Sequence, residues 1–298
     1  MGNVLHETTF IKNKNHKFFS PAKINLFLHI TGKREDGYHT LISLMCSVRL
    51  YDILFFSFGA EKLRVFCNHP LVPDDETNLV FLAAELFMDR FEQARGIEII
   101  LEKKIPVGAG LGGGSSNAAS VLLFLNRYYG YPFGMDELIS MGASLGSDVP
   151  FFIFQRPAIV AGTGEKLVAY QGIGQLYALI IYPGFSISTS MIYKDFDLGL
   201  TNSKKKVKSD SLNSHTITSP FDPRAELVND LENVAALKYP EIGRMKNALI
   251  ANRAINVLMT GSGSAVFGLF SDFEAVKKAK YNLLKCSGWR IYVAQLLV

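Results

Sequence analysis

The 298-residue sequence has few cysteines, and they form no recognisable pattern. Cys46, Cys67 and Cys286 lie far apart, and neither a CxxC pair nor a Cys/His cluster accompanies them. This scarcity argues against a disulfide framework and against a structural zinc site. A reducing compartment is the default for such a chain, and we expect the cytoplasm.

The sequence also lacks long apolar runs and a strong excess of charge. No uninterrupted apolar stretch approaches the roughly 18 residues of a membrane span, and Met1–Lys17 is polar, unlike a secretory signal. Lys and Arg number 31 against 27 Asp and Glu, a net charge of +4. We therefore expect neither a membrane nor a nucleic-acid partner.

What the sequence does contain is typical of a packed globular protein, with 48% hydrophobic and 19% charged residues. Alternating apolar residues predict a strand over Phe18–Ile30, with Lys23 and Asn25 on the face opposite Ile24. The same kind of pattern predicts further strands at Tyr38–Val48, Tyr51–Phe58, Leu63–Cys67, Ile97–Leu101, Phe151–Phe154, Ala158–Ala161, Leu176–Tyr182, Asn256–Met259, Ala265–Phe270 and Trp289–Leu296.

Three- and four-residue spacing of apolar residues predicts helices between these strands. They are expected at Asn78–Phe91, from about Ser115 to Tyr129, at Asp136–Leu145, from Ser188, and at Arg224–Leu237, Glu241–Asn252 and Asp272–Leu284. The lysine-rich Thr201–Ser219 is expected to be a solvated loop. The whole pattern predicts an α+β chain of two domains, residues 1–167 and 168–298.

The stretch with the clearest chemical meaning is Gly108–Asn117, in which five glycines precede a Ser-Ser-Asn sequence and an apolar helical pattern. Backbone N–H groups at a helix start favour an anion, most often a phosphate. No GK[ST] follows, so this is not a Walker loop, and the acidic residue of a dinucleotide fingerprint is missing. A purely structural glycine link stays an alternative.

Together with three other stretches, this loop resembles the GHMP kinases. The matching stretches are Pro21–Leu41 (PAKINLFLHITGKREDGYHTL), Pro106–Ser120 (PVGAGLGGGSSNAAS), Leu145–Phe152 (LGSDVPFF) and Thr260–Phe267 (TGSGSAVF). The resemblance implies an N-terminal ribosomal-protein-S5-domain-2-like domain and a C-terminal ferredoxin-like α/β domain. It also implies a kinase that phosphorylates a small alcohol with ATP and Mg²⁺.

The resemblance implies that Lys23 and Asp148 form the catalytic pair. Asp148 could accept the proton of the alcohol during phosphoryl transfer, and the Lys23 cation would keep the carboxylate ionised. From the residues alone, a surface lysine and a turn aspartate before Val-Pro stay open as alternatives.

The resemblance further implies which residues contact ATP. These are Pro106, Val107, Gly108, Ala109, Gly110, Leu111, Gly112, Gly113, Gly114, Ser115, Ser116, Asn117, Asn78 and Lys104. The Ser116 hydroxyl is one candidate ligand for Mg²⁺, and no other metal ligand is assigned.

Within the family, the likeness is strongest to members that phosphorylate the 2-hydroxyl of a cytidine diphosphate-linked methylerythritol in non-mevalonate isoprenoid biosynthesis. It implies an acceptor site made of Asn25, Tyr38, His39, Thr189 and Tyr193, in which an aromatic ring can stack on a pyrimidine. A kinase for homoserine, mevalonate or a sugar, and a non-catalytic nucleotide-binding relative, stay open. For the assembly we expect a monomer or a weak homodimer.

Overall fold

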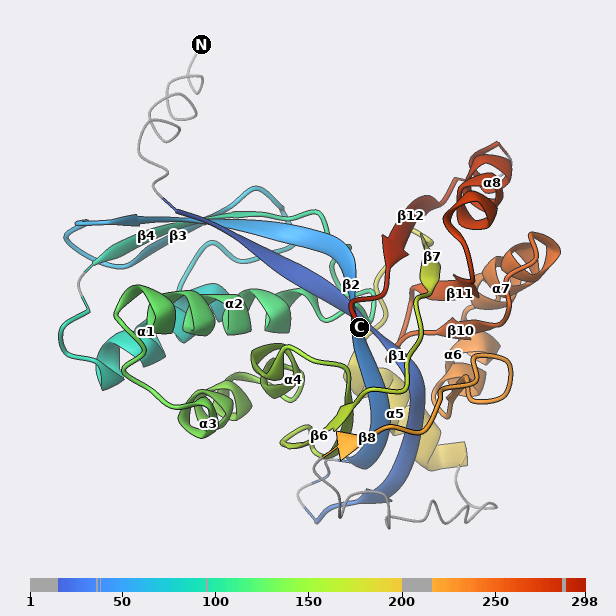
Figure 1. The fold of residues 1–298 in the computed structure, drawn as a ribbon, viewed down its shortest axis with the longest axis horizontal. Coiled ribbons are helices and arrows are strands. Elements are labelled where there is room, and N and C mark those ends of the chain that lie inside the picture. Colours follow the sequence, from blue (N-terminus) through green and yellow to red (C-terminus); the bar gives the residue numbers. More distant parts are fainter. Residues whose placement is uncertain (1–15, 36, 38, 95, 200–215, 286–287) are drawn as a thin grey trace.

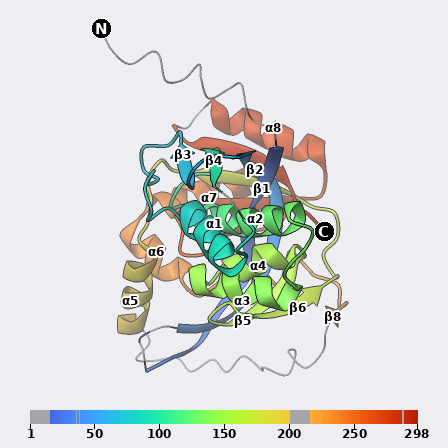
Figure 2. The same cartoon turned by 90° about the vertical axis from the view of Figure 1, so that its left-hand side faces the viewer.

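Figure 1 shows the fold in a computed structural model, which describes residues 16–298 except 36, 38, 95, 200–215 and 286–287. Two β-sheets lie at the centre, and helices cover their outer faces, as the two views show (Figures 1 and 2). Tyr38 and most of the predicted lysine-rich loop lie outside the described residues. Among the helices that the structure describes, none combines the length and the apolar character that a membrane crossing needs.

The first sheet is built around two long antiparallel strands. Its strands are β1 (His16–Lys33), β2 (His39–Phe58), β3 (Arg64–Cys67), β4 (Ile97–Glu102), β5 (Ala158–Gly162), β6 (Lys166–Tyr170), β8 (Thr216–Ile217) and β9 (Val228–Asn229). Their order is β3-β4-β2-β5-β6-β8, and β1 pairs with β2 and β9. The domain boundary predicted after residue 167 falls within β6 and stays a prediction.

The strands predicted at Tyr38–Val48 and Tyr51–Phe58 are one continuous strand, so the predicted break between them is wrong. Pro21 pairs with Tyr51, whereas the next residue, Ala22, pairs with Val48. This register shift makes β2 bulge at residues 49 and 50, and the chain passes the interruption without leaving the sheet.

Four helices cover the outer face of the first sheet: α1 (Leu79–Arg90), α2 (Gly113–Tyr128), α3 (Met135–Leu145) and α4 (Val149–Phe154). Helix α1 begins where the Asn78 side chain accepts a hydrogen bond from the Val80 N–H at 2.9 Å. Helix α2 begins at Gly113, slightly earlier than expected.

The strand predicted at Phe151–Phe154 is wrong, because these residues form helix α4. Five successive residues, from Val149 to Ile153, are buried, so the segment shows no helical periodicity in its sequence. Pro150 lies in the first turn of this helix, where its missing N–H is tolerated. The segment is therefore a fully buried short helix that the apolar pattern alone cannot distinguish from a strand.

The second sheet has four antiparallel strands in the order β10-β11-β7-β12. These are β7 (Tyr177–Tyr182), β10 (Val257–Met259), β11 (Val266–Phe270) and β12 (Arg290–Gln295), with helices α5 (Thr189–Gly199), α6 (Glu232–Lys238), α7 (Glu241–Ala251) and α8 (Phe273–Leu284). Only the end of the helix predicted at Arg224–Leu237 is helical. The part at Val228–Asn229 is strand β9, because this backbone pairs with β1.

Alternation along β7 shows how the layers are held together. Ala178 and Ile180 pack into a core between the two sheets, whereas Leu179 and Ile181 pack into a core beneath α6, α7 and α8. A further core lies between the first sheet and helices α1 to α4. The order of layers is helices, sheet, sheet, helices, and the functional cleft lies where the first sheet, its helices and the second half of the chain meet.

Candidate active site

A cleft of about 1050 Å³ is lined by residues from both halves of the chain. The first half contributes Lys23 and Asn25 from β1, the whole of Pro106–Ser115, and Asp148. The second half contributes residues of α5 and of the turn between β10 and β11, among them Tyr193. The cleft therefore collects most of the residues that the sequence selects.

The glycine loop forms one wall of the cleft and passes close to the second glycine turn. A Cβ atom on Gly110 would lie 2.1 Å from the Thr260 carbonyl oxygen, and Gly110 has a φ of +76°. Gly112 is left-handed at the N-cap of α2, where no side chain caps the helix. Because a helix start leaves its first N–H groups without intrahelical partners, this wall offers donors to an anion in the cleft.

The structure brings Lys23 and Asp148 together at the cleft. The Lys23 ammonium nitrogen lies 3.5 Å from Asp148 Oδ2 and donates a 2.6 Å hydrogen bond to Asn25 Oδ1. The Lys23 side chain is 4% exposed, whereas the Asp148 side chain is 28% exposed. The Lys23 backbone N–H also donates to the Leu111 carbonyl at 3.0 Å, which ties β1 to the glycine loop.

Asn25 is held from two sides, which fixes the orientation of its amide. Its Nδ2 donates to Ser43 Oγ at 2.8 Å, and its backbone N–H donates to Thr260 Oγ1 at 3.1 Å. Ser43 in turn donates to the Phe27 carbonyl at 2.6 Å. The side-chain amide oxygen of Asn25, Oδ1, is thereby directed at the Lys23 ammonium.

The end of the cleft at α5 carries two neighbouring rings. The His39 and Tyr193 centroids are 5.0 Å apart, with the planes tilted by 33°. Burial, and then the negative charge of Asp148, raise the pKa of Tyr193 to about 12, so its phenol stays protonated at neutral pH. Thr189 lines the same end, and its hydroxyl lies 2.8 Å from the Ser262 hydroxyl.

Two predicted ATP contacts do not lie in the cleft. Lys104 is exposed and is absent from the cleft lining, where its neighbour Lys103 takes its place, because successive side chains of an extended chain point to opposite faces. Ser116 is fully buried, and its hydroxyl lies 2.7 Å from the Ser20 hydroxyl. This placement does not support the predicted ligand role of the Ser116 hydroxyl. Asn78 does line the cleft.

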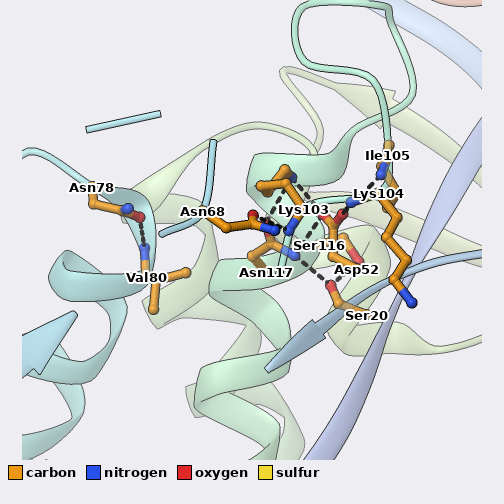
Figure 3. Close-up of polar contacts among 10 residues, drawn as sticks. All are labelled: Ser20, Asp52, Asn68, Asn78, Val80, Lys103, Lys104, Ile105, Ser116 and Asn117. Carbon is orange, nitrogen blue, oxygen red and sulfur yellow. Dashed lines mark hydrogen bonds and ion pairs between the residues drawn. The ribbon is translucent and has the colours of Figure 1, made fainter. Parts of the chain in front are cut away.

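A polar cluster behind the glycine loop was not predicted. Figure 3 shows the Asp52 carboxylate at its centre, with Lys103 and Asn117 bonded to it. The alternation of Ile97, Ile99 and Leu101 would have placed Lys103 on the buried face of its strand. Asp52 is the only acidic residue in the mostly apolar strand β2, and its partners lie far along the chain.

Comparison with known proteins identifies the class of this cleft. Residues 78–156 match the model of the GHMP kinases N terminal domain, and residues 221–287 match that of the GHMP kinases C terminal domain. The chain is 41% identical to 4-diphosphocytidyl-2-C-methyl-D-erythritol kinase of Syntrophotalea carbinolica over 93% of this chain and 98% of the relative. It is also 41% identical to the enzyme of the same name from Syntrophus aciditrophicus, over 93% and 97%.

A solved structure of a 4-(cytidine 5'-diphospho)-2C-methyl-D-erythritol kinase is similar in fold as well. It superposes with a TM-score of 0.75 at 32% identity and covers 94% of this chain and 99% of its own. The glycine loop and the cleft therefore belong to an ATP-dependent small-molecule kinase. The chain belongs to the GHMP kinases and, within them, to the family of 4-diphosphocytidyl-2-C-methyl-D-erythritol kinases.

Proposed function

We propose that the chain transfers the γ-phosphate of ATP to the 2-hydroxyl of 4-diphosphocytidyl-2-C-methyl-D-erythritol, giving the 2-phosphate and ADP. The observation that carries this proposal is the position of the Lys23–Asp148 pair. It lies in one cleft with the glycine loop and with the His39–Tyr193 ring pair. The family membership supports the same acceptor.

The chemistry follows from the exposure of the two groups. Asp148 is open enough to reach a bound hydroxyl, and it would accept the hydroxyl proton as the oxygen bonds to the γ-phosphorus and the bond to ADP breaks. The nearly buried Lys23 ammonium offsets negative charge that develops on the phosphoryl oxygens. Asn25 keeps that ammonium directed at the reacting groups.

Mg²⁺ would accompany ATP, since it neutralises the β- and γ-phosphate oxygens of nucleotides when bound. The few side-chain oxygens in the cleft fit a Mg²⁺ ion that keeps several water ligands, because Mg²⁺ bound to a nucleotide needs only one or two protein ligands. The Ser115 hydroxyl lines the cleft and would hold it. The buried Ser116 hydroxyl is not available in this arrangement.

The His39 and Tyr193 rings favour an acceptor alcohol that carries a pyrimidine over an alcohol without one. Tyr193 would stack on the cytosine ring, and His39 would hydrogen-bond its edge. Both roles, and those of Asn25 and Thr189, are proposals that rest on the cleft lining.

Acceptor competition tests the proposal. Purified protein should release ADP with the cytidine-linked alcohol and not with mevalonate or homoserine. Tyr193→Ala should raise KM for the cytidine-linked alcohol, whereas Tyr193→Phe, which keeps the ring, should leave it near the wild-type value. Turnover only with a cytidine-free alcohol would refute the assigned acceptor.

We further propose a cytoplasmic enzyme that is a monomer or a weak homodimer. Cys46 and Cys67 are both free thiols, which fits a reducing compartment. Sedimentation over a range of concentrations tests the assembly, and a tight dimer at low concentration would contradict it.

A further inference from the structure

The most heavily bonded charged group near the cleft is the Asp52 carboxylate, which is fully buried in β2. Its Oδ1 accepts hydrogen bonds from the backbone N–H groups of Lys104 and Ile105 at 2.6 and 2.9 Å. Its Oδ2 accepts from the Lys103 ammonium and, at 3.0 Å, from Asn117 Nδ2 (Figure 3). All four donors come from the protein, and Asp52 is not among the residues that line the cleft.

These bonds connect β2, the segment that follows β4, and helix α2. Asp52 belongs to β2, Lys103–Ile105 lead from β4 into the glycine loop, and Asn117 lies one turn into α2. The Asn117 amide closes the cluster, because its Oδ1 accepts from the Lys103 ammonium at 3.0 Å and its Nδ2 also donates to Ser20 at 2.9 Å. One carboxylate thus fixes both ends of the glycine loop to the sheet.

Lys103 needs such a carboxylate more than most lysines do. Its side chain is only 3% exposed, and a Cβ atom on Gly113 would lie 3.0 Å from its ammonium nitrogen. The ammonium therefore lies at the start of α2, where the helix dipole is positive and disfavours a second positive charge. Asp52 offsets that charge with an ion pair inside the protein.

We propose that Asp52 is a positioning residue for the nucleotide half of the cleft and acts through Lys103. Lys103 lines the cleft, and among the described residues its ammonium has two hydrogen-bond partners, Asp52 and Asn117. One of its three hydrogens is left for an anionic ligand. The inference rests on the proposed ATP site, and it assigns to Asp52 the task of holding this cation and the loop entrance in place.

The test compares four proteins: wild type, Asp52→Asn, Lys103→Met and the double variant. Asp89→Asn, an exposed carboxylate on α1, is the matched control. The first measurement is direct binding of a non-hydrolysable ATP analogue without acceptor. The second is KM for ATP and for the cytidine-linked alcohol, measured separately.

Asp52→Asn should weaken analogue binding about tenfold or more, as the loss of a charged hydrogen-bond partner does. KM for ATP should rise by a similar factor, while KM for the alcohol stays near the wild-type value. In the Lys103→Met background, the same change should have little further effect, because the two residues act as one unit. Asp89→Asn should bind as wild type does.

Three results would overturn the proposal: unchanged analogue binding in Asp52→Asn, an equal rise of both KM values, or an equal effect of Asp52→Asn with and without Lys103. If Asp52→Asn fails to fold, the double variant is used instead, because it leaves no unpaired buried cation. Its analogue binding is compared with that of Lys103→Met alone. Much weaker binding by the double variant would count against the proposal. A wild type that binds the analogue and phosphorylates nothing would refute the proposed function and leave the Asp52 test intact.

Discussion

Asp148→Asn is expected to lower catalysis far more than stability. The change keeps the size of the side chain and leaves an amide oxygen that can still accept a hydrogen bond. What it removes is the negative charge and the ability to take up a proton. The Lys23 ammonium keeps its 2.6 Å hydrogen bond to Asn25.

The structure predicts a small effect of Asp148→Asn on the free energy of unfolding and a large effect on kcat. The Lys23–Asp148 contact is 3.5 Å long and its carboxylate is partly exposed, so the pair contributes about 1 kcal/mol or less to the free energy of unfolding. Loss of a general base lowers kcat by a factor of about 10² to 10⁴, which is about 3 to 5 kcal/mol in the activation barrier. The loss of activity should therefore far exceed the loss of stability.

The assay is ADP release at saturating ATP and cytidine-linked alcohol, together with chemical denaturation of the same samples. Asp89→Asn serves as the control for a carboxylate-to-amide change outside the cleft. A variant with wild-type kcat would show that Asp148 is not the base. A variant whose activity falls only as far as its folded fraction falls would show that Asp148 is structural.

Three further substitutions test other parts of the cleft and the core. Ser43→Ala removes the hydroxyl that orients the Asn25 amide, and kcat should fall about tenfold, as expected for one lost buried hydrogen bond near the reacting groups; an unchanged kcat would contradict the orientation argument. Gly110→Ala places a Cβ atom 2.1 Å from a backbone carbonyl oxygen, so denaturation should show a larger loss of stability than Gly59→Ala, whose φ is also positive but whose Cβ would meet no atom within 4 Å. Equal losses would mean that φ alone is responsible. Burial raises the pKa of Cys46 from 9.0 to about 12, so the unfolded state loses this proton first, and the free energy of unfolding should fall as the pH rises from about 9 towards 12. Cys46→Ala should show a shallower fall, and identical pH profiles would contradict the raised pKa.

Sequence patterns predicted the elements that have one apolar and one polar face. The alternation around Lys23 and Asn25 identified β1 and the face that points into the cleft. The helical spacing of Asn78–Phe91 identified α1. In such elements, periodicity follows from the contrast between an apolar core face and a polar face, which lies in solvent for α1 and at the cleft for β1.

The same reasoning failed where tertiary contacts decide the structure of a segment. Helix α4 is apolar throughout, so its period disappears and its sequence looks like a buried strand. Strand β9 is two residues long and exists because Asn229 donates to the Met259 and Gly261 carbonyls while its backbone pairs with β1. Neither cause can be seen within a local window of sequence.

Two lysine–carboxylate pairs lie at the same cleft, and their surroundings suit them to different tasks. Asp148 is 28% exposed and pairs with Lys23 at 3.5 Å, which leaves oxygen lone pairs within reach of a bound hydroxyl. Asp52 is fully buried and accepts four hydrogen bonds from protein donors, so it has no capacity left to accept a proton from a substrate. Its partner Lys103 nevertheless lines the cleft. Residue type alone would make the two carboxylates equivalent, and the number of hydrogen bonds already made is what suits Asp148 to the proposed role of base and Asp52 to the proposed role of anchor.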